Sequence, residues 1–225
     1  MSNRIFIQRR FFAFLFFLLS LPSLLTACNR TPPLREYFSE YRSNLFVAET
    51  EAFSLRAYAL EKEHPFVSDG MAGEKTTRTE IYITASDGAL PCNLAFKVGS
   101  VDYGGESGYD GVKREYFFSC SADISGLYLL PIQVQLGDTV YEITAHSVKT
   151  ENTLSGEDAV QILKETESDY FQSLSNKNGF DAELHVRLLY EEAPFYYVGV
   201  VEKSGKRTAF LLDAQTGKLL AKREA

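Results

Sequence analysis

Residues 127–147 read LYLLPIQVQLGDTVYEITAHS, and this stretch decides the fold class. Apolar and polar residues alternate along 127–135 and again along 139–147, which is the period of a half-buried β-strand. Between these segments, Leu136-Gly137-Asp138 is a tight hairpin signal. We therefore predict two antiparallel strands joined by a short turn.

The period of two extends over residues 45–148, with further candidate strands at 92–99 and 113–120. Several short strands separated by Gly, Asp and Ser turns predict a β-sandwich, and an immunoglobulin-like arrangement is the first expectation. The chain contains no Trp. Its absence removes one hallmark of antibody domains without excluding the wider architecture.

A short helix is expected ahead of these strands. Its apolar positions follow helical spacing, and they are Leu34, Tyr37, Phe38, Tyr41 and Leu45. The β-sandwich domain, including this helix, is therefore expected to span residues 34–148.

A second domain is predicted at residues 155–225, after a linker at 149–154. Ser155 followed by Asp158 is similar to a capping box, and an amphipathic helical pattern follows it. Strands are then expected at 181–191, 194–203, 206–213 and 218–222. One helix packed on a small antiparallel sheet is an α+β unit. The predicted fold class is thus mainly β with an α+β C-terminal unit.

The end of the chain also carries a family resemblance. Residues 194–224, PFYYVGVVEKSGKRTAFLLDAQTGKLLAKRE, resemble the carboxyl half of PepSY-type domains, which close on an Asp-Ala-x-Thr-Gly hairpin. The matching residues are Tyr196, Tyr197, Val198, Val200, Leu212, Asp213, Ala214, Thr216, Gly217 and Leu219. Some members of that family are propeptides that restrain peptidases. The resemblance implies a regulatory or interaction module.

The amino terminus, residues 1–27, is typical of a secretory signal peptide. Basic residues precede an apolar run at 11–25, FFAFLFFLLSLPSLL. A membrane-spanning helix needs roughly 20 apolar residues, so a permanent span is the weaker interpretation. Leu25-Thr26-Ala27-Cys28 resembles the lipobox of bacterial lipoproteins. That resemblance implies cleavage before Cys28, acylation of Cys28 and a lipidated tether at 28–33. Ordinary secretion is the alternative.

Charge bears on the expected partners. The net charge is −7, and it falls to −10 when Arg4, Arg9 and Arg10 leave with the signal peptide. An acidic body is repelled by nucleic acid, so no nucleic-acid partner is expected. The expected location is the bacterial cell membrane or outer membrane, with the lipid at Cys28 and the body outside the cytoplasm. The sequence does not predict an oligomeric state.

Two cysteines remain beside Cys28. If strands 92–99 and 113–120 pair antiparallel, then Cys92 faces Cys120 and Lys97 faces Glu115. A location outside the cytoplasm permits oxidation. A structural disulfide Cys92–Cys120 is therefore predicted, and two buried thiols are the alternative.

Residues 100–111 are predicted to form a glycine-rich binding loop. Its candidate contact residues are Asp102, Tyr103, Glu106, Tyr109 and Asp110. Loops on rigid scaffolds often carry binding. Three carboxylates could also collect Ca²⁺, but their spacing matches no EF-hand, so no metal site is predicted. A solvated hairpin loop is the alternative.

An aromatic interaction face is predicted in the C-terminal region, at Tyr190, Phe195, Tyr196 and Tyr197. On a small sheet, alternate members must face outward, and Tyr is common at interfaces. The alternative is that these rings cover the sheet under the helix.

No catalytic signature is present: the chain has neither G-x-S-x-G nor S-x-x-K, and its three His lack zinc spacings. No catalytic residue and no cofactor are predicted. The expected function is a non-enzymatic binding or interaction module that contacts an envelope protein or wall component. The alternative is a modulator or inhibitor of an extracytoplasmic peptidase, acting through the PepSY-like domain. A hydrolase built from scattered acids is a third hypothesis.

Overall fold

The structure is a computed structural model that describes residues 33–85, 90–177 and 179–224. The expected signal peptide and Cys28 lie outside the described residues. Pro33–Ala225 form one compact unit. Within the described ranges, no helix is both long enough and apolar enough to cross a membrane.

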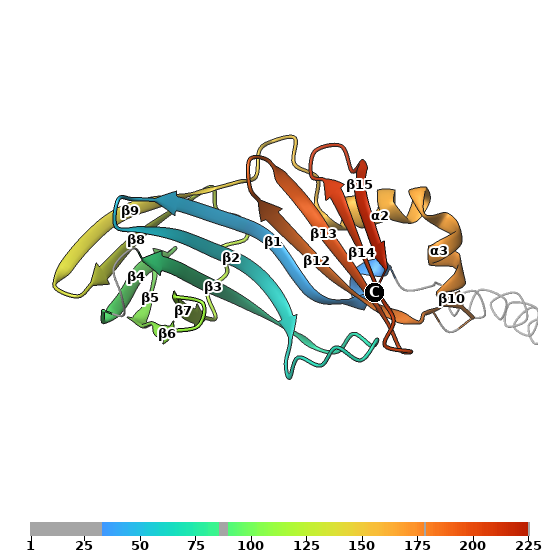
Figure 1. The fold of residues 1–225 in the computed structure, drawn as a ribbon, viewed down its shortest axis with the longest axis horizontal. Coiled ribbons are helices and arrows are strands. Elements are labelled where there is room, and N and C mark those ends of the chain that lie inside the picture. Colours follow the sequence, from blue (N-terminus) through green and yellow to red (C-terminus); the bar gives the residue numbers. More distant parts are fainter. Residues whose placement is uncertain (1–32, 86–89, 178, 225) are drawn as a thin grey trace, which may run out of the picture. The chain divides into compact units, whose positions relative to one another are not determined.

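The described chain is built mostly from β-strands (Figure 1). It begins with a short 3-10 helix, η2 (Leu34–Tyr37), and two α-helices lie in its second half, α2 (Gly156–Thr166) and α3 (Ser168–Ser173). The strands are β1 (Phe38–Glu49), β2 (Phe53–Glu63), β3 (Lys75–Ala85), β4 (Cys92–Val98), β5 (Val101–Glu106), β6 (Gly108–Asp110), β7 (Glu115–Cys120), β8 (Leu129–Leu136), β9 (Thr139–Ser147), β10 (Ser175–Asn176), β11 (Gly179–Phe180), β12 (Ala182–Tyr190), β13 (Pro194–Glu202), β14 (Arg207–Asp213) and β15 (Leu219–Glu224).

One sheet of 13 strands connects the first half of the chain to the second. Its main path runs β15-β14-β13-β12-β1-β2-β3-β7-β6, and β9, β8, β4 and β5 continue from β1. The link between the halves is β1, which pairs in parallel with β12 and antiparallel with β2. Its far end also pairs with β9.

The predicted fold class is therefore wrong. An immunoglobulin-like sandwich followed by an α+β unit would require separate sheets, whereas β12 continues the sheet of β1. The carboxyl-terminal strands do not form a small sheet of their own. Alternation along each strand predicts which face is buried, but it does not specify the neighbouring strand.

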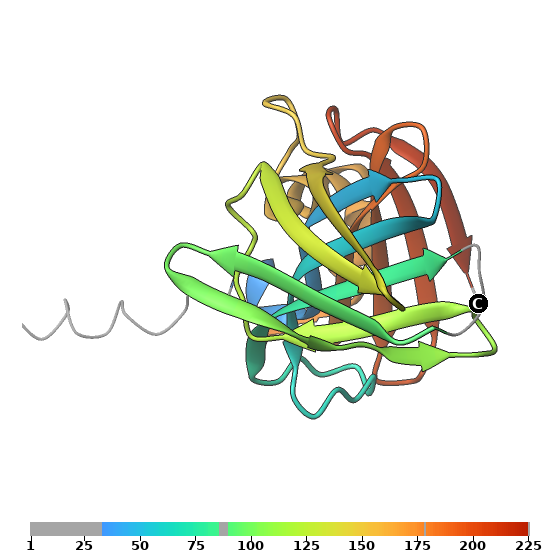
Figure 2. The same cartoon turned by 90° about the vertical axis from the view of Figure 1, so that its left-hand side faces the viewer.

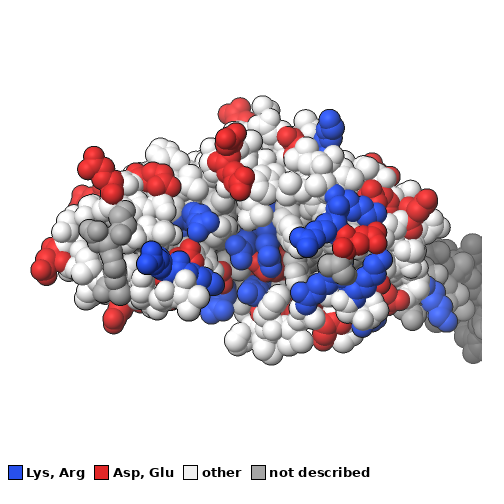
Figure 3. Space-filling model, viewed as in Figure 1, with Lys and Arg blue, Asp and Glu red and all other residues white. Residues whose placement is uncertain are grey.

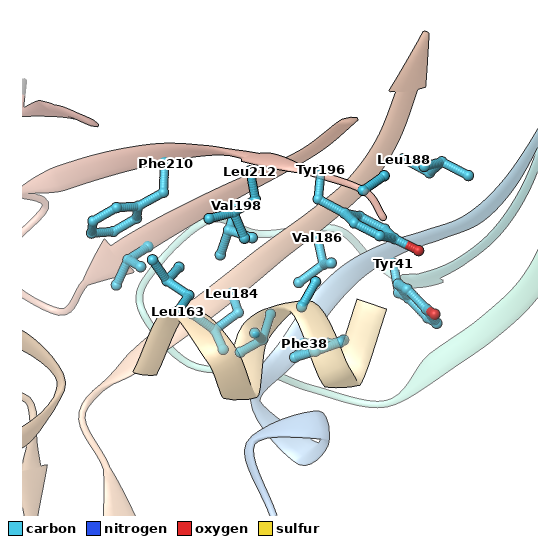
Figure 4. Packing of buried hydrophobic residues seen from close by; sticks show 14 of the residues in the cluster. Phe38, Tyr41, Leu163, Leu184, Val186, Leu188, Tyr196, Val198, Phe210 and Leu212 are labelled. Atoms are coloured by element: carbon cyan, nitrogen blue, oxygen red, sulfur yellow. The ribbon is translucent and has the colours of Figure 1, made fainter. Parts of the chain in front are cut away.

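Two hydrophobic clusters stabilise the sheet. In the first, α2 and α3 cover one face of β12–β14, where Leu163 of α2 meets Leu184, Val186 and Val198 (Figure 4). The second cluster lies in the part of the sheet that curves until it is nearly barrel-shaped. Figure 2 shows the yellow β8 and β9 and the green β4 lying across the blue and teal β1 and β2. Side chains such as Phe46 and Ile132 fill the interior of this curved part.

The helix expected from residue 34 is wrong beyond its first turn, because β1 begins at Phe38. The register of β1 shifts between Phe38 and Glu40 and again between Arg42 and Asn44. Each β-bulge adds one residue to the strand and changes the spacing of its buried positions. The first bulge therefore places Phe38 and Tyr41, three residues apart, on one face of the sheet, whereas Leu45 is buried on the other face by its pairing with Tyr58. Because both faces of β1 are buried here, the spacing of the three residues imitates a helix.

The predicted start of the C-terminal helix is confirmed. Ser155 is the N-cap of α2, and its Oγ accepts a 3.0 Å hydrogen bond from Asp158 N. The next residue, Gly156, has to be small because the ring of Tyr41 lies against it: a Cβ there would be 2.3 Å from Tyr41 Cε2. The Tyr41 hydroxyl in turn accepts from Gly156 N at 3.1 Å. This contact fixes α2 against β1.

Candidate functional site

One face of the sheet carries charged residues at its centre. Glu40 and Arg42 of β1 are paired with His185 and Arg187 of β12, and Glu183 precedes these two on the same side of β12. Alternate residues of a strand share a face, so these side chains lie on the face opposite α2. We call these five residues the polar face.

Glu40 lies at the centre of the polar face, and its side chain is only 1% exposed. Its Oε1 accepts a 2.7 Å hydrogen bond from Arg42 Nε, and its Oε2 accepts a 2.6 Å bond from Arg187 Nη2. Burial would raise the pKa of Glu40, but the two guanidinium charges and their hydrogen bonds outweigh it and lower the pKa to about 2. Glu40 is thus an ionised carboxylate held by two arginines.

Both arginines also lie over aromatic rings. The guanidinium carbon of Arg42 is 4.5 Å from the ring centroid of Tyr58, and that of Arg187 is 5.5 Å from the centroid of Tyr197. Among the described residues, Arg187 Nε is buried without a hydrogen-bond partner. The arginines are held in place by these contacts and keep donor capacity beyond their bonds to Glu40.

Glu183 and His185 form the second pair of the polar face. Glu183 is fully buried, and its Oε1 lies 2.9 Å from His185 Nε2. Burial lowers the pKa of His185 below its ordinary value, although the hydrogen bond and charge of Glu183 act in the opposite direction. Phe66, from the segment after β2, lies beside the imidazole with ring centroids 5.6 Å apart. His185 is therefore a neutral ring at pH 7.

Basic side chains extend the polar face in both directions. The strand register places five more of them on the same face: Arg56, Lys62, Arg78, Arg207 and Arg223. Figure 3 shows Lys and Arg gathered over the middle of the view, where β2, β12 and β14 lie in Figure 1. Three acids of the same face are buried: Glu40 between two arginines, Glu80 with a hydrogen bond from Tyr82, and Glu183 with a hydrogen bond to His185. An acidic chain thus presents a locally basic surface, which attracts anions.

A pocket of about 290 Å³ lies at the β14–β15 end of this surface. We call it the basic pocket. It is lined by His185, Tyr197, Gly199, Val200, Val201, Arg207, Thr208, Ala209 and Arg223. Two arginines and a tyrosine provide several hydrogen-bond donors around one small volume. This chemistry suits an anionic group.

A second pocket, of about 400 Å³, lies at the β6–β7 end. We call it the aromatic pocket. It is lined by Tyr82, Gly108, Tyr109, Asp110, Lys113, Glu115 and Phe117. The rings of Tyr82 and Phe117 have centroids 5.1 Å apart, and Phe117 is 41% exposed. The Arg56–Glu115 ion pair, at 3.0 Å, lies beside this pocket. An apolar group could stack here on exposed rings.

The predicted binding loop 100–111 is not a loop, because most of it forms β5 and β6. Asp102 pairs with Lys97 at 3.2 Å, and Tyr103 stacks on a neighbouring ring of β4. Glu106 ends β5 and is exposed. These three residues therefore line neither pocket.

Tyr109 and Asp110 alone of the five predicted loop residues line the aromatic pocket. Asp110 Oδ1 accepts hydrogen bonds from the backbone N of Val112 and Lys113, and these bonds lower the pKa of Asp110. This carboxylate orders the turn between β6 and β7. Among the described residues, no group of three or more His, Cys, Asp or Glu side chains is arranged to hold a metal ion.

The predicted pairing of the cysteine strands is wrong, and Cys92 and Cys120 are free thiols. Strand β4 forms a hairpin with β5 instead, turning at Gly99, whose φ of 60° suits glycine. Cys92 is paired with Leu136 of β8, and Cys120 with Thr79 of β3. Burial raises the pKa of both thiols.

The predicted aromatic face is divided between the two sides of the sheet. Tyr196 is buried under α2, and its hydroxyl donates to Leu154 O at 2.8 Å. Tyr197 lies on the opposite side, in the basic pocket. Phe195 shares the side of Tyr197 by alternation, and Tyr190 is exposed at the end of β12.

Sequence reasoning missed the polar face itself. Glu183, His185 and Arg187 alternate with Leu184 and Val186 in the sequence, and this pattern was a usable signal. Charged residues on alternate strand positions are normally solvated. The pairing of β12 with β1 and the contact of Phe66 with His185 involve residues far away in the sequence, so this signal could not reveal the buried cluster.

No family model matches the chain, and no curated protein or solved structure is significantly similar to it. The resemblance of residues 194–224 to PepSY-type domains therefore stays a prediction.

Proposed function

We propose that this protein is a lipid-anchored, extracytoplasmic binding module that holds an anionic component of the cell envelope on its basic surface. The observation that carries the proposal is the segregation of charge. The chain has 30 acids and 23 basic residues, yet the open face of its sheet gathers arginines around buried acids. This surface attracts an anionic partner despite the negative net charge.

The buried ion pairs support binding over a purely structural role. A buried salt bridge contributes little net stability compared with apolar packing. Arg42 and Arg187 are instead each held by one hydrogen bond to Glu40 and by an aromatic ring, so the surface is preorganised for a partner. Preorganisation lowers the entropy cost of binding.

The anchor is the second part of the proposal. Acylation of Cys28 would attach the body to a bilayer, since each buried methylene contributes about 0.8 kcal/mol and two or more chains give stable attachment. Labelled palmitate should enter the wild-type protein and not a Cys28→Ala variant. Equal labelling of both proteins, or of neither, would contradict the anchor.

Photocrosslinking in cells tests the binding surface. A photoreactive residue at Thr76, an exposed position of β3 paired with Lys62, should capture an anionic envelope molecule. The same residue at Lys164, exposed on α2, should not. Arg78→Gln should weaken the Thr76 adduct, and Arg114→Gln should leave it unchanged. Adducts of equal yield at both positions would contradict the proposal. Capture of an extracytoplasmic peptidase at Thr76 would favour the modulator that the PepSY resemblance implies.

A further inference from the structure

Two arginines of the basic pocket have no acidic partner. Four arginines of the described residues form no ion pair with an acid, and they are Arg78, Arg114, Arg207 and Arg223. Of these four, Arg207 and Arg223 line the basic pocket together. The other described arginines are each held by a carboxylate. Two unneutralised guanidinium groups on one small volume repel each other, and an anion between them relieves the repulsion.

The strand register allows both arginines to reach one group. Arg223 of β15 is paired with Ala209 of β14, which is two residues from Arg207. Such diagonal neighbours on adjacent strands are roughly 7–8 Å apart. Each guanidinium presents a planar fork of N–H donors suited to phosphate and carboxylate oxygens. One oxyanion can therefore accept from both side chains.

The base of the pocket is made of small residues. Gly199 and Ala209 are paired across β13 and β14, with His185 beyond Gly199 on β12. A Cβ at Gly199 would be 3.0 Å from the hydroxyl oxygen and from Cε1 of Tyr197. The absence of a Cβ at Gly199 thus lets the Tyr197 ring lie flat against β13. The ring forms one wall of the pocket while the space above Ala209 stays open.

The neighbouring acids are engaged elsewhere. Glu224, next to Arg223 in the chain, lies 3.4 Å from Lys206 and 3.8 Å from Lys222. Glu183 is bound to His185 and fully buried. No described carboxylate competes for Arg207 or Arg223.

We propose that the basic pocket binds the phosphate group of a phosphate ester. Two guanidinium groups match its charge, and their N–H pairs match its oxygens. A volume of about 290 Å³ is near the lower limit of small-molecule sites, so a small group esterified to the phosphate fits against Tyr197. This inference deepens the proposed function, on which it rests, because it names the anionic group of the envelope component.

Calorimetric titration of the full chain, purified in a non-ionic detergent, tests the pocket with glycerol 3-phosphate as the probe. Binding should weaken about tenfold or more in Arg207→Gln and in Arg223→Gln, since each loses a charge-assisted contact. Arg114→Gln removes an equal charge elsewhere and should change the affinity less than about twofold. Circular dichroism confirms that each variant is folded. No binding by the wild type, or equal binding by all variants, would overturn the inference.

The same titration separates two sources of the phosphate. Soluble dihexanoyl phosphatidylglycerol carries the head group of an anionic lipid, whereas glycerol 3-phosphate lacks the acyl chains. Tighter binding of the lipid, dependent on Arg207, assigns a lipid head group. Tighter binding of glycerol 3-phosphate assigns a soluble or polymer-borne ester. Either result supports a phosphate site.

The titration and the crosslinking test the phosphate site and the proposed function separately. If glycerol 3-phosphate and the lipid both fail to bind while the Thr76 adduct still depends on Arg78, the pocket assignment falls and the binding surface remains. If the adduct fails and the titration succeeds, the envelope role falls and the phosphate site remains.

Discussion

Glu40 and Arg187 are 147 residues apart in the chain, yet Arg187 Nη2 donates a 2.6 Å hydrogen bond to Glu40 Oε2. Arg42 Nε donates to the other oxygen of the same carboxylate at 2.7 Å. The pair joins β1 to β12 on the polar face, where the two strands run parallel. Substitution of Glu40 measures how much these hydrogen bonds contribute to the free energy of unfolding.

Replacing Glu40 with Gln should lower the free energy of unfolding by about 3 kcal/mol, because it leaves two arginines without their counter-charge. The substitution keeps the size of the side chain. Glu51→Gln, at an exposed position between β1 and β2, is the control and should change stability by less than about 0.5 kcal/mol. Chemical denaturation measures both. Equal effects would show that the buried carboxylate is not stabilised by its arginines.

Acid should remove the contribution of Glu40 to the free energy of unfolding over a defined pH range. Its pKa is lowered in the folded protein from 4.5 to about 2, so folding is favoured by the ionised form. The stability difference between the wild type and Glu40→Gln should be fully present at pH values above the pKa of Glu40 in the unfolded chain. It should disappear as the pH falls through the pKa of Glu40 in the folded protein. Denaturation at a series of pH values between 7 and 2 tests this. A difference that is constant with pH would contradict the assignment of an ionised carboxylate.

Two glycines with positive φ offer a matched comparison. Gly217, in the turn between β14 and β15, has a φ of 70°, and a Cβ there would be 2.6 Å from Ile162 Cδ1 of α2. Gly205 has a φ of 85° with nothing within 4 Å. Gly205→Ala should cost about 1 kcal/mol through backbone strain alone. Gly217→Ala should cost about 2 kcal/mol or more, since crowding adds to the strain. Equal losses would mean that the turn does not pack on α2.

The thiols give a fourth test. Because burial raises the pKa of Cys92 and Cys120, both should react slowly with a thiol reagent in the folded protein and fully in denaturant. A reductant should leave the melting temperature unchanged. Thiols that stay unreactive in denaturant until a reductant is added would instead reveal a disulfide.

Local signals predicted many strands correctly. The hairpin at Leu136-Gly137-Asp138 is confirmed, with β8 and β9 paired from Leu129↔His146 to Leu136↔Thr139. The last four strands also lie close to their predicted ranges. Alternation and turn residues act over a few positions, so they predict strands and turns without knowledge of the rest of the fold.

Strand partners could not be read in the same way. Cys92 has Leu136 opposite it and not Cys120, because the Gly99 turn joins β4 to β5 first. The register of β1 against β12 depends on residues more than a hundred positions apart. The polar face arises from that register, so neither its arginines nor the basic pocket could be predicted as a group from the sequence.

The parallel pairing of β1 with β12 also constrains how the chain can fold as it is made. Synthesis begins at the amino terminus, so β1 exists long before residues 182–190 do. One edge of β1 then lacks the backbone hydrogen bonds that β12 supplies, and such an edge is prone to pair with another chain. Contacts between distant segments also slow folding. We therefore expect β1 to be open to pairing with other chains until the last strands of the chain arrive, and a molecule truncated before β12 should aggregate.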